Sequence, residues 1–505
     1  MAHDGRVSFT TTRSSGDADD RDDASRRDDR ISDLSDNILH QILVLIPFLE
    51  AVRTCVLSRR WRGVWTRLPL LILHAGEDAP PPRVRRFADH MDGVLRGYSD
   101  ANVDVDNLFV WVDSDTVITN PVRLAAAAAH LAARRVTGRL AIFLSPTSAD
   151  MYHMAGDGEA VLLQLPCLPR VTHFSLTFIG VHLEMPMAGT FASLTSMYLA
   201  GVRFTDDGEG ISDVVSSRCP RIKILDLLTV RGLRTLTVVS RSLVSLRLCG
   251  VMELERLRVV AAELGEMVVD TCFVLNGGAG AAMLLVAPAL EKLRWEDRCP
   301  RELGGPWKLP GCLLKLVVTE VVLPERLDNG ARGQSNFTRI LDLFQRVHIL
   351  RLHVPIARDH ANQKSLIENL NIPYCPELEF IASHTKHKFG PTIIRLLKRN
   401  ICVRKLSIQM SPKEQARYIP CASDCNCRQV TIWRDKGVNL IPLEWVIMYE
   451  FSGSHDENSF IYYIILRNAK ALRRVSIVFS AGVEPTRRFL RKLHKLSAPG
   501  CAVEY

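Results

Sequence analysis

The stretch Leu243–Leu248, "LVSLRL", carries leucines at its first, fourth and sixth positions. Side chains alternate along a strand, so Leu246 and Leu248 point the same way. One such strand cannot bury its apolar side alone. Stacked neighbours can, in a curved solenoid with a parallel sheet on its concave side. Whether this spacing recurs therefore decides the fold.

The same spacing recurs along most of the chain. Its copies are Val171/Phe174/Leu176, Leu194/Met197/Leu199, Ile222/Leu225/Leu227, Leu243/Leu246/Leu248, Leu290/Leu293/Trp295, Leu313/Leu316/Val318, Val347/Leu350/Leu352, Val403/Leu406/Ile408, Leu443/Val446/Met448 and Leu472/Val475/Ile477, with Leu264/Met267/Val269 as a degenerate copy. The starts lie roughly 21 to 28 residues apart up to Leu313, as in leucine-rich repeats. The later intervals of about 34, 56 and 40 residues indicate insertions or missed copies.

The fold class predicted is therefore α/β: an irregular leucine-rich-repeat solenoid with a parallel β-sheet over residues 166–410. The preceding segment, 71–165, is predicted as a linker with entry repeats or a cap. It reads as a helix over 81–98, a strand over 107–113, an alanine-rich helix over 120–138 and a strand over 139–145. This alternation matches the architecture of the repeats that follow.

Residues 29–70 form a separate, short helical module. Apolar residues recur at helical spacing from Leu34 to Ile46, which predicts a helix that starts near Ser35 or Asp36 and ends at Pro47. A second helix is predicted over Leu49–Leu57 and a third after Ser58. Three short helices cannot cover this much apolar surface for one another. The remainder either caps the first repeat or contacts another protein.

This module resembles the F-box. The family pattern is Leu-Pro-Asp-x-(Ile/Val)-Leu-x-x-Ile, a break with Pro, then an Arg, and then Leu-Ser-(Lys/Arg)-Arg-Trp-(Arg/Lys)-x-(Leu/Val)-Trp. Fourteen positions match: Leu34, Asp36, Ile38, Leu39, Ile42, Pro47, Arg53, Leu57, Ser58, Arg59, Arg60, Trp61, Arg62 and Trp65. The chain departs at Ser35, where Pro is usual, but both residues start helices.

The resemblance implies that the module docks on a Skp-type adaptor and, through it, reaches a cullin and a RING protein. The docking surface it implies consists of Leu34, Ile38, Leu39, Ile42, Leu43, Ile46 and Pro47, with Leu57, Trp61 and Trp65 contributing to the interface or to the module's own core.

Residues 411–480 resemble the FBD region that ends many plant F-box proteins with leucine-rich repeats. The matching positions are Phe451, Gly453, Glu457, Phe460, Leu466, Ala469 and Leu472. A strand, a helix and a further strand are predicted here, as one more solenoid turn. Residues 481–505 are predicted as a closing basic amphipathic helix and tail.

Composition limits the setting. Residues 1–28 are charged and poor in apolar side chains, which predicts a disordered tail. The net charge of +9 is a mild bias for a chain of 505 residues, and the basic residues are scattered. Nucleic acid is therefore not an expected partner. No secretory signal and no apolar run of about 18 residues is recognised, so we expect a location in the nucleus and/or cytoplasm, no membrane association and reduced cysteines.

No cofactor, metal site or catalytic residue is predicted. The sequence has neither a phosphate-binding loop nor a nucleophile elbow nor an H-E-x-x-H motif. Cys421, Cys425 and Cys427, with His384 and His387 upstream, lack the paired C-x₂-C spacing of structural zinc sites.

The function predicted is that of a non-catalytic substrate receptor: the F-box subunit of an SCF-type cullin-RING ubiquitin ligase, presenting a protein target on its repeats. Two alternatives stay open. One is a ligase-independent scaffold for protein interactions. The other is a ligand-dependent co-receptor with a polar concave pocket, for which Arg247, Arg294, Arg351 and His353 are candidates. The substrate and the residues that bind it stay unknown.

Overall fold

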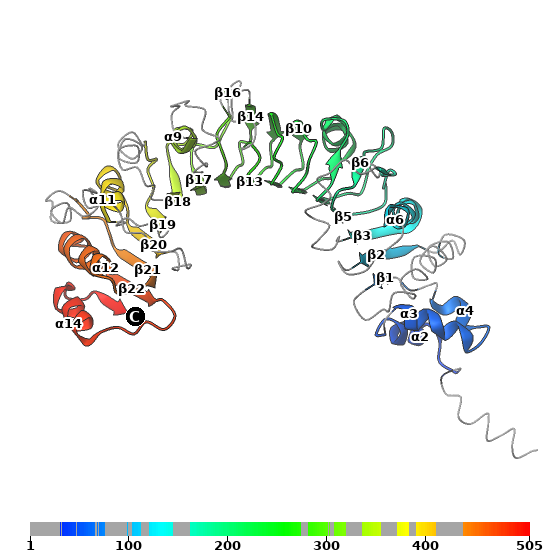
Figure 1. Ribbon diagram of the computed structural model, residues 1–505, viewed down its shortest axis with the longest axis horizontal. Coiled ribbons are helices and arrows are strands. Elements are labelled where there is room, and N and C mark those ends of the chain that lie inside the picture. The colour runs from blue at the N-terminus through cyan, green and yellow to red at the C-terminus, as the bar shows by residue number, and fades with distance from the viewer. Residues whose placement is uncertain are drawn as a thin grey trace, which may run out of the picture.

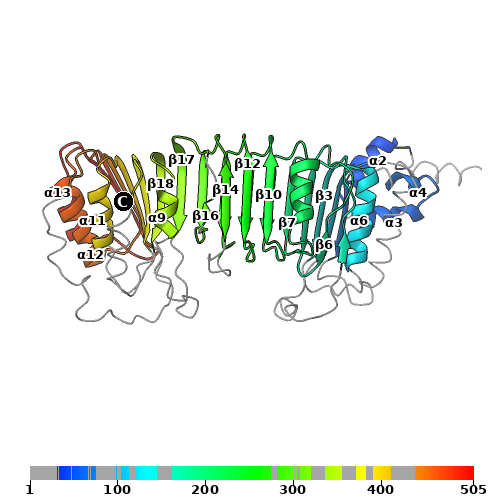
Figure 2. The same ribbon diagram turned by 90° about the horizontal axis from the view of Figure 1, so that it is seen from above.

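The chain forms an open arch of stacked repeats (Figures 1 and 2). In this computed structural model the described residues are 31, 33–46, 48–65, 68, 70–75, 98, 104–112, 121–144, 162–273, 281–300, 302–303, 308–319, 336–354, 371–382, 390–410 and 438–505. The predicted tail, most of the predicted helix over 81–98 and the cysteines Cys421, Cys425 and Cys427 lie outside them.

Within these described ranges, a parallel sheet of sixteen strands lines the inner side of the arch. Its strands, in spatial order, are β1 (Leu70–Ala75), β2 (Val105–Val112), β3 (Val136–Leu144), β5 (His173–Phe178), β7 (Ser196–Ala200), β9 (Ile224–Leu228), β11 (Ser245–Cys249), β13 (Glu266–Asp270), β15 (Lys292–Glu296), β17 (Leu313–Thr319), β18 (Val347–Val354), β19 (Glu377–Ala382), β20 (Lys405–Met410), β21 (Trp445–Phe451), β22 (Arg474–Phe479) and β23 (Ala502–Glu504). The predicted α/β solenoid with a parallel sheet is confirmed.

The outer side of the arch changes along its length. Its helices are α6 (Pro121–Arg135), α8 (Glu209–Asp213) with η3 (Val214–Arg218), α9 (Asn336–Leu341), α11 (Gly390–Arg399), α12 (His455–Ser459) with η7 (Phe460–Ile465) and α13 (Leu466–Asn468), and α14 (Arg487–Leu496). Two small sheets complete it: β4 (Leu162–Gln164), β6 (His182–Glu184) and β8 (Arg203–Phe204), and β10 (Thr235–Ser240), β12 (Arg256–Ala261), β14 (Ala282–Val286) and β16 (Glu302–Leu303).

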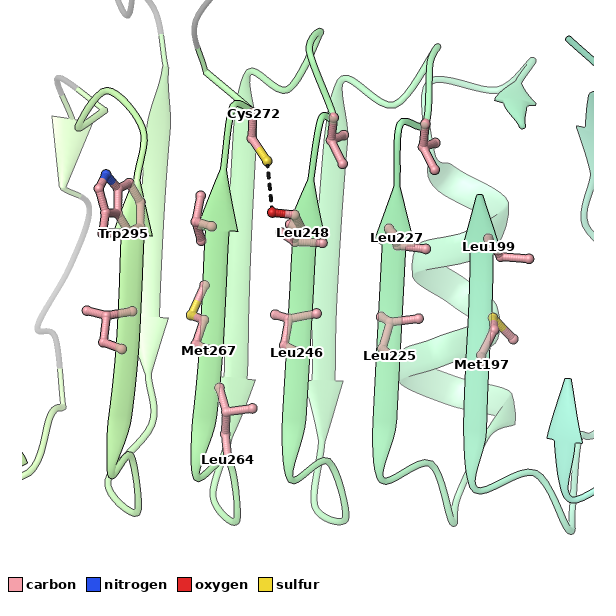
Figure 3. Packing of buried hydrophobic residues seen from close by; sticks show 14 of the residues in the cluster. Met197, Leu199, Leu225, Leu227, Leu246, Leu248, Leu264, Met267, Cys272 and Trp295 are labelled. Atoms are coloured by element: carbon pink, nitrogen blue, oxygen red, sulfur yellow. Dashed lines mark hydrogen bonds between the residues drawn. The ribbon is translucent and has the colours of Figure 1, made fainter. Parts of the chain in front are cut away.

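The core is a continuous ladder of the predicted apolar positions. Leu225, Leu246, Met267 and Leu293 are successive partners across β9, β11, β13 and β15, and all are buried. Figure 3 shows Leu225, Leu246 and Met267 at one level on successive inner strands. Each repeat therefore covers the apolar face of the next, as the spacing predicts.

A sharp turn follows each central strand. Gly201, Thr229, Gly250 and Thr271 come directly after β7, β9, β11 and β13, and all have positive φ. Their N–H groups continue the ladder between repeats; that of Gly250, for example, donates to the carbonyl of Asp270 at 2.8 Å. Left-handed backbone suits glycine, so the two threonines are held there by the repeat on each side.

The structure also contains repeats that the sequence spacing does not reveal. Cys375, Leu378 and Phe380 lie midway in the longest interval and place β19 there. Leu236 and Val238 of β10 are buried in the outer sheet, although they carry the same spacing as the inner strands. In the centre of the chain each repeat is therefore made of two strands, one per layer.

Both ends of the arch agree with the predicted elements. Strands β2 and β3 and helix α6 occupy the predicted positions, and β1 begins the sheet directly after the helical module. At the other end, β21, the helices α12 to α13, β22 and α14 follow in the predicted order, and β23 adds one more strand beyond the closing helix.

Candidate functional site: the helical module and its exposed flank

The helical module consists of α2 (Asp36–Leu43), α3 (Phe48–Arg53), the 3-10 turn η1 (Thr54–Val56) and α4 (Trp61–Val64). Helix α2 starts after Ser35, as predicted, and the backbone of Ser35 is extended, but the helix ends at Leu43, before Pro47. The second helix, predicted over Leu49–Leu57, is α-helical only as far as Arg53 and continues as the 3-10 turn η1.

Polar contacts fix the first and last helices to each other. The guanidinium of Arg60 donates to the carboxylate of Asp36 at 2.7 and 3.0 Å and also to the carbonyl of Leu34. The Nε2 atom of His40 lies 2.9 Å from the carbonyl oxygen of Val64. These contacts join residues 24 or more positions apart, so they set the geometry of the module rather than of single helices.

The module is held against the first strand of the solenoid, which α3 contacts. Leu39, Leu43 and Trp61 are buried in one continuous cluster with Leu71 and Leu73 of β1. At the other side of the module, the Trp65 ring meets the Tyr98 ring edge to face at 5.9 Å. The hydroxyl of Tyr98 donates to the carbonyl of Trp65 at 2.7 Å, and burial raises the pKa of this tyrosine. The module therefore caps the edge of the long sheet.

This packing corrects part of the predicted docking surface. In the free chain Leu39 and Leu43 have almost no exposed surface, so they cannot reach a partner without rearrangement. Trp61 is also buried, in line with its alternative assignment to the module's own core. Leu34, Ile46 and Trp65 are half-buried against the same cluster, and Pro47 lies outside the described residues.

The outer flank of the module keeps large apolar side chains in contact with solvent. Ile38 and Ile42 of α2 are each 43% exposed, and Leu45 just beyond is 84% exposed. In the turn that follows α3, Val56 is 83% and Leu57 63% exposed. Ile38 and Ile42 are four residues apart on one face of α2, and Leu45 follows in the turn just beyond the helix. Their adaptor contacts stay a prediction, but this flank is where the predicted contacts are accessible.

Leu45 and Val56 are additions that the family pattern does not single out. Leu45 does belong to the helical stripe that begins at Leu34, so the periodicity contains the signal for it. Val56 follows no such stripe, because it lies in a 3-10 turn whose side-chain directions differ from those of an α-helix.

The arginines considered for a ligand pocket do not converge. Arg247, Arg294 and Arg351 all lie on the inner face, but on β11, β15 and β18, with a strand between each pair. Each faces a carboxylate: Arg294 meets Glu296 at 2.9 Å, and Arg351 meets Glu379 at 2.8 Å.

Arg247 lies 3.7 Å from Asp226, a looser pair. Burial lowers the pKa of His353, which favours the neutral ring. The centre of the concave face is thus a surface of alternating, mutually compensating charges.

A second accessible region lies on the concave face beside the helical module. Trp111 of β2 stacks on Phe143 of β3 with ring centroids 4.2 Å apart, and Ile72 of β1 is exposed nearby in the same sheet. These residues follow the alternate positions of the strands, opposite to the buried ones. Aromatic side chains of this kind often anchor protein partners.

Other classes of site find no support in the described part of the chain. No group of three or more His, Cys, Asp or Glu residues there is arranged to hold a metal ion. No helix within the described ranges combines the length and apolar character needed to cross a membrane.

Comparison with known proteins identifies the helical module. The F-box domain family matches residues 31–73. An F-box/FBD/LRR-repeat protein of Arabidopsis thaliana is 23% identical over 470 residues, which cover 89% of each chain. Another from the same plant is 55% identical over 47 residues, 9% of this chain and 10% of its own.

The meiotic F-box protein MOF of Oryza sativa subsp. japonica is 34% identical over 136 residues. That alignment covers 25% of this chain and only 26% of the rice protein. The chain therefore carries an F-box followed by a leucine-rich-repeat-like solenoid. The resemblance to the plant F-box/FBD/LRR-repeat proteins predicted from the sequence is confirmed.

Proposed function

We propose that this protein is the substrate-recognition subunit of an SCF-type cullin-RING ubiquitin ligase, acting in the nucleus and/or cytoplasm. The F-box would bind a Skp-type adaptor, which would link it to the cullin and the RING protein. The chain itself would be non-catalytic. A protein target would be held on the concave face of the solenoid.

The observation that carries the proposal is the exposed flank of the F-box. Its inner side already caps the solenoid, so Ile38, Ile42, Leu45, Val56 and Leu57 have no structural task that explains their exposure. Exposed apolar side chains clustered on one small module mark a protein interface. A stable interface buries about 800 Å² per partner.

The packing of the F-box against the solenoid supports the other part of the proposal, that the arch presents a target. The apolar cluster runs without interruption from Leu39 through Leu71 into the solenoid, so the arch is held in one orientation relative to the docked adaptor. A target bound on the arch would then face the ubiquitin-charged enzyme at a raised effective concentration. No residue of this chain would need to take part in the chemistry.

The test is co-purification with a plant Skp-type adaptor. The double variant Ile38→Asp/Ile42→Asp places charges on the exposed flank and leaves the buried face intact. We expect it to lose the adaptor, because two carboxylates would be desolvated at the interface. The control is Ile401→Asp/Ile441→Asp, whose isoleucines are 66% and 59% exposed but lie far along the chain. Equal adaptor recovery by all three proteins would contradict the docking assignment.

A scaffold that uses the F-box without promoting ubiquitin transfer is separated by a second measurement. With the proteasome inhibited, a receptor should cause one of its interaction partners to accumulate as ubiquitin conjugates, and the accumulation should disappear in the Ile38→Asp/Ile42→Asp variant. Adaptor binding without any such conjugate would favour the scaffold.

A further inference from the structure

The positive charge of the chain is concentrated at its C-terminal end. Residues 467–505 hold nine basic and two acidic side chains, whereas the whole chain has a net charge of only +9. The preceding residues are therefore close to neutral. The mild net charge counted over the full length hides this concentration.

Helix α14 carries most of this charge on one surface. Arg487, Arg488, Arg491, Lys492 and Lys495 are all exposed, and the helix contains no acidic residue. Their spacing places them on two adjacent stripes about 12 Å long. The opposite side of the helix is apolar.

The apolar side of α14 is locked into the end of the solenoid. The Phe489 ring lies 5.5 Å from the Phe451 ring and 5.7 Å from the Tyr462 ring. The hydroxyl of Tyr462 donates to the carbonyl of Phe489 at 3.2 Å, and Leu493 is fully buried. Because this side faces the protein, it cannot insert into a membrane, and the exposed basic residues are carried by a helix held at the end of the arch (Figure 1).

The basic face is not neutralised by its surroundings. Within the described part of the chain, Arg487, Arg488, Arg491 and Lys495 form no ion pair. The ammonium group of Lys492 lies 4.2 Å from the Tyr462 ring centroid, which holds it in place without removing its charge.

The inner sheet behaves in the opposite way. Arg404, for example, binds Glu444 at 2.6 Å, and Arg474 is engaged by Glu504. These two arginines are thus paired within the chain, whereas those on α14 stay available to a partner.

We propose that the basic face of α14 is a docking site for an acidic segment, rich in Asp and Glu, of a partner protein. Arginine binds carboxylates through two parallel hydrogen bonds, and three arginines lie on this face. An extended segment advances about 3.3 Å per residue, so four or five residues would cover the face. The site is separate from the F-box flank and from the concave face, and it does not depend on the proposed ligase function.

A polypeptide fits this face better than a nucleic acid does. Binding of single-stranded nucleic acid combines basic residues with aromatic rings on which bases stack. Here Phe489 is buried, and Tyr462 and Tyr463 lie beneath Lys492. The exposed rings near the face, Tyr463 and Tyr505, are each already engaged, by the Lys492 ammonium group and by the His494 ring, so charge and bidentate donors are the main features that the face offers.

The test uses the full chain and a fluorescently labelled peptide of eight alternating Asp and Glu residues, with a peptide of eight alternating Asn and Gln residues as the neutral probe. The variant is Arg487→Glu/Arg491→Glu/Lys495→Glu. Its matched control is Arg241→Glu/Arg256→Glu/Arg258→Glu, which changes the net charge equally at exposed positions elsewhere. We expect binding of the acidic peptide to weaken about tenfold or more in the variant and less than about threefold in the control.

Three results would overturn the proposal: no binding of the acidic peptide to the unaltered protein, equal losses in the variant and the control, or tighter binding of a thymidine oligonucleotide of equal charge through the same residues. Should the charge-reversal variant misfold, Arg487→Gln/Arg491→Gln/Lys495→Gln removes the charges without reversing them. That variant must then show the weakened binding.

Discussion

Replacing Leu39 by Ala should loosen both the F-box and the start of the solenoid, whereas Ile38→Ala should not. The two residues are neighbours of similar size on α2. Leu39 has no exposed surface and belongs to the cluster that includes Leu71 and Leu73 of β1. Ile38 is on the solvent side of the same helix. The pair therefore separates the capping role of the module from its docking role.

The magnitudes follow from burial. A fully enclosed Leu→Ala change costs about 2–5 kcal/mol, through lost contacts and the cavity left behind. For Ile38, which keeps much of its surface in water, the cost should be about 1 kcal/mol or less. A decrease of about 3 kcal/mol in the free energy of opening accelerates amide exchange roughly hundredfold.

Hydrogen exchange measured by mass spectrometry reads this out by segment. With Leu39→Ala we expect faster exchange in peptides covering 36–64 and also in those covering 70–75, because the two regions share one core. With Ile38→Ala both regions should keep nearly their original rates. If Leu39→Ala accelerates exchange only within the helices, the F-box opens independently of the sheet and the continuous-cap reasoning is wrong.

Three further predictions concern the solenoid. Burial raises the pKa of Asp297 from 3.8 to about 6. The folded state thus favours the protonated acid, and stabilisation of up to about 3 kcal/mol, present below about pH 4, should be lost as the pH rises to about 6. The melting temperature of the unaltered protein should fall over this pH range, and that of Asp297→Asn should fall less. Parallel pH profiles of the two melting temperatures would contradict the role given to Asp297. Gly232→Ala should destabilise by about 1–3 kcal/mol in urea unfolding, because φ is +66° and the added Cβ would lie 2.1 Å from the carbonyl oxygen of Phe204. The control Gly453→Ala meets nothing within 4 Å and should cost less; equal costs would refute the steric reasoning. Glu457→Ala removes a buried carboxylate that completes the capping box of α12, and should speed amide exchange over 455–465; unchanged exchange there would show that the cap is dispensable.

The repeats could be predicted because the alternation of apolar and polar residues is visible within the sequence of each strand. Leu246 and Leu248 alternate with polar neighbours, and that suffices to define a strand with one buried face. The copy at Cys375 is hidden because cysteine stands where a leucine or valine is usual, although buried cysteine packs as a small apolar residue. Leu236 and Val238 show the opposite difficulty, because their local pattern does not reveal which layer a strand joins.

The docking surface could be predicted only in part, for a related reason. Helical spacing marks Leu39 and Ile38 alike as apolar, and the family pattern includes both. Only the folded structure separates them, because Leu39 is buried in the core and Ile38 lies on the solvent side. Likewise, the number of basic residues is visible in the sequence, but their availability depends on whether a neighbouring strand supplies a carboxylate. Glu444 supplies a carboxylate to Arg404, whereas Arg491 forms no ion pair among the described residues.

The apolar richness of the F-box follows from its having two faces to fill. A solenoid needs a cap, because β1 would otherwise leave a row of unpaired backbone groups and an open core at its edge. Leu43 and Trp61 are buried within the chain, whereas Ile42 and Leu57 stay exposed, where the proposed adaptor would contact them. A module that performs both tasks ties its own folding to that of the arch, so damage to the buried face should lower adaptor binding indirectly. Damage to the exposed flank should lower it while the arch stays intact, and this difference makes the flank substitutions the sharper test of the ligase proposal.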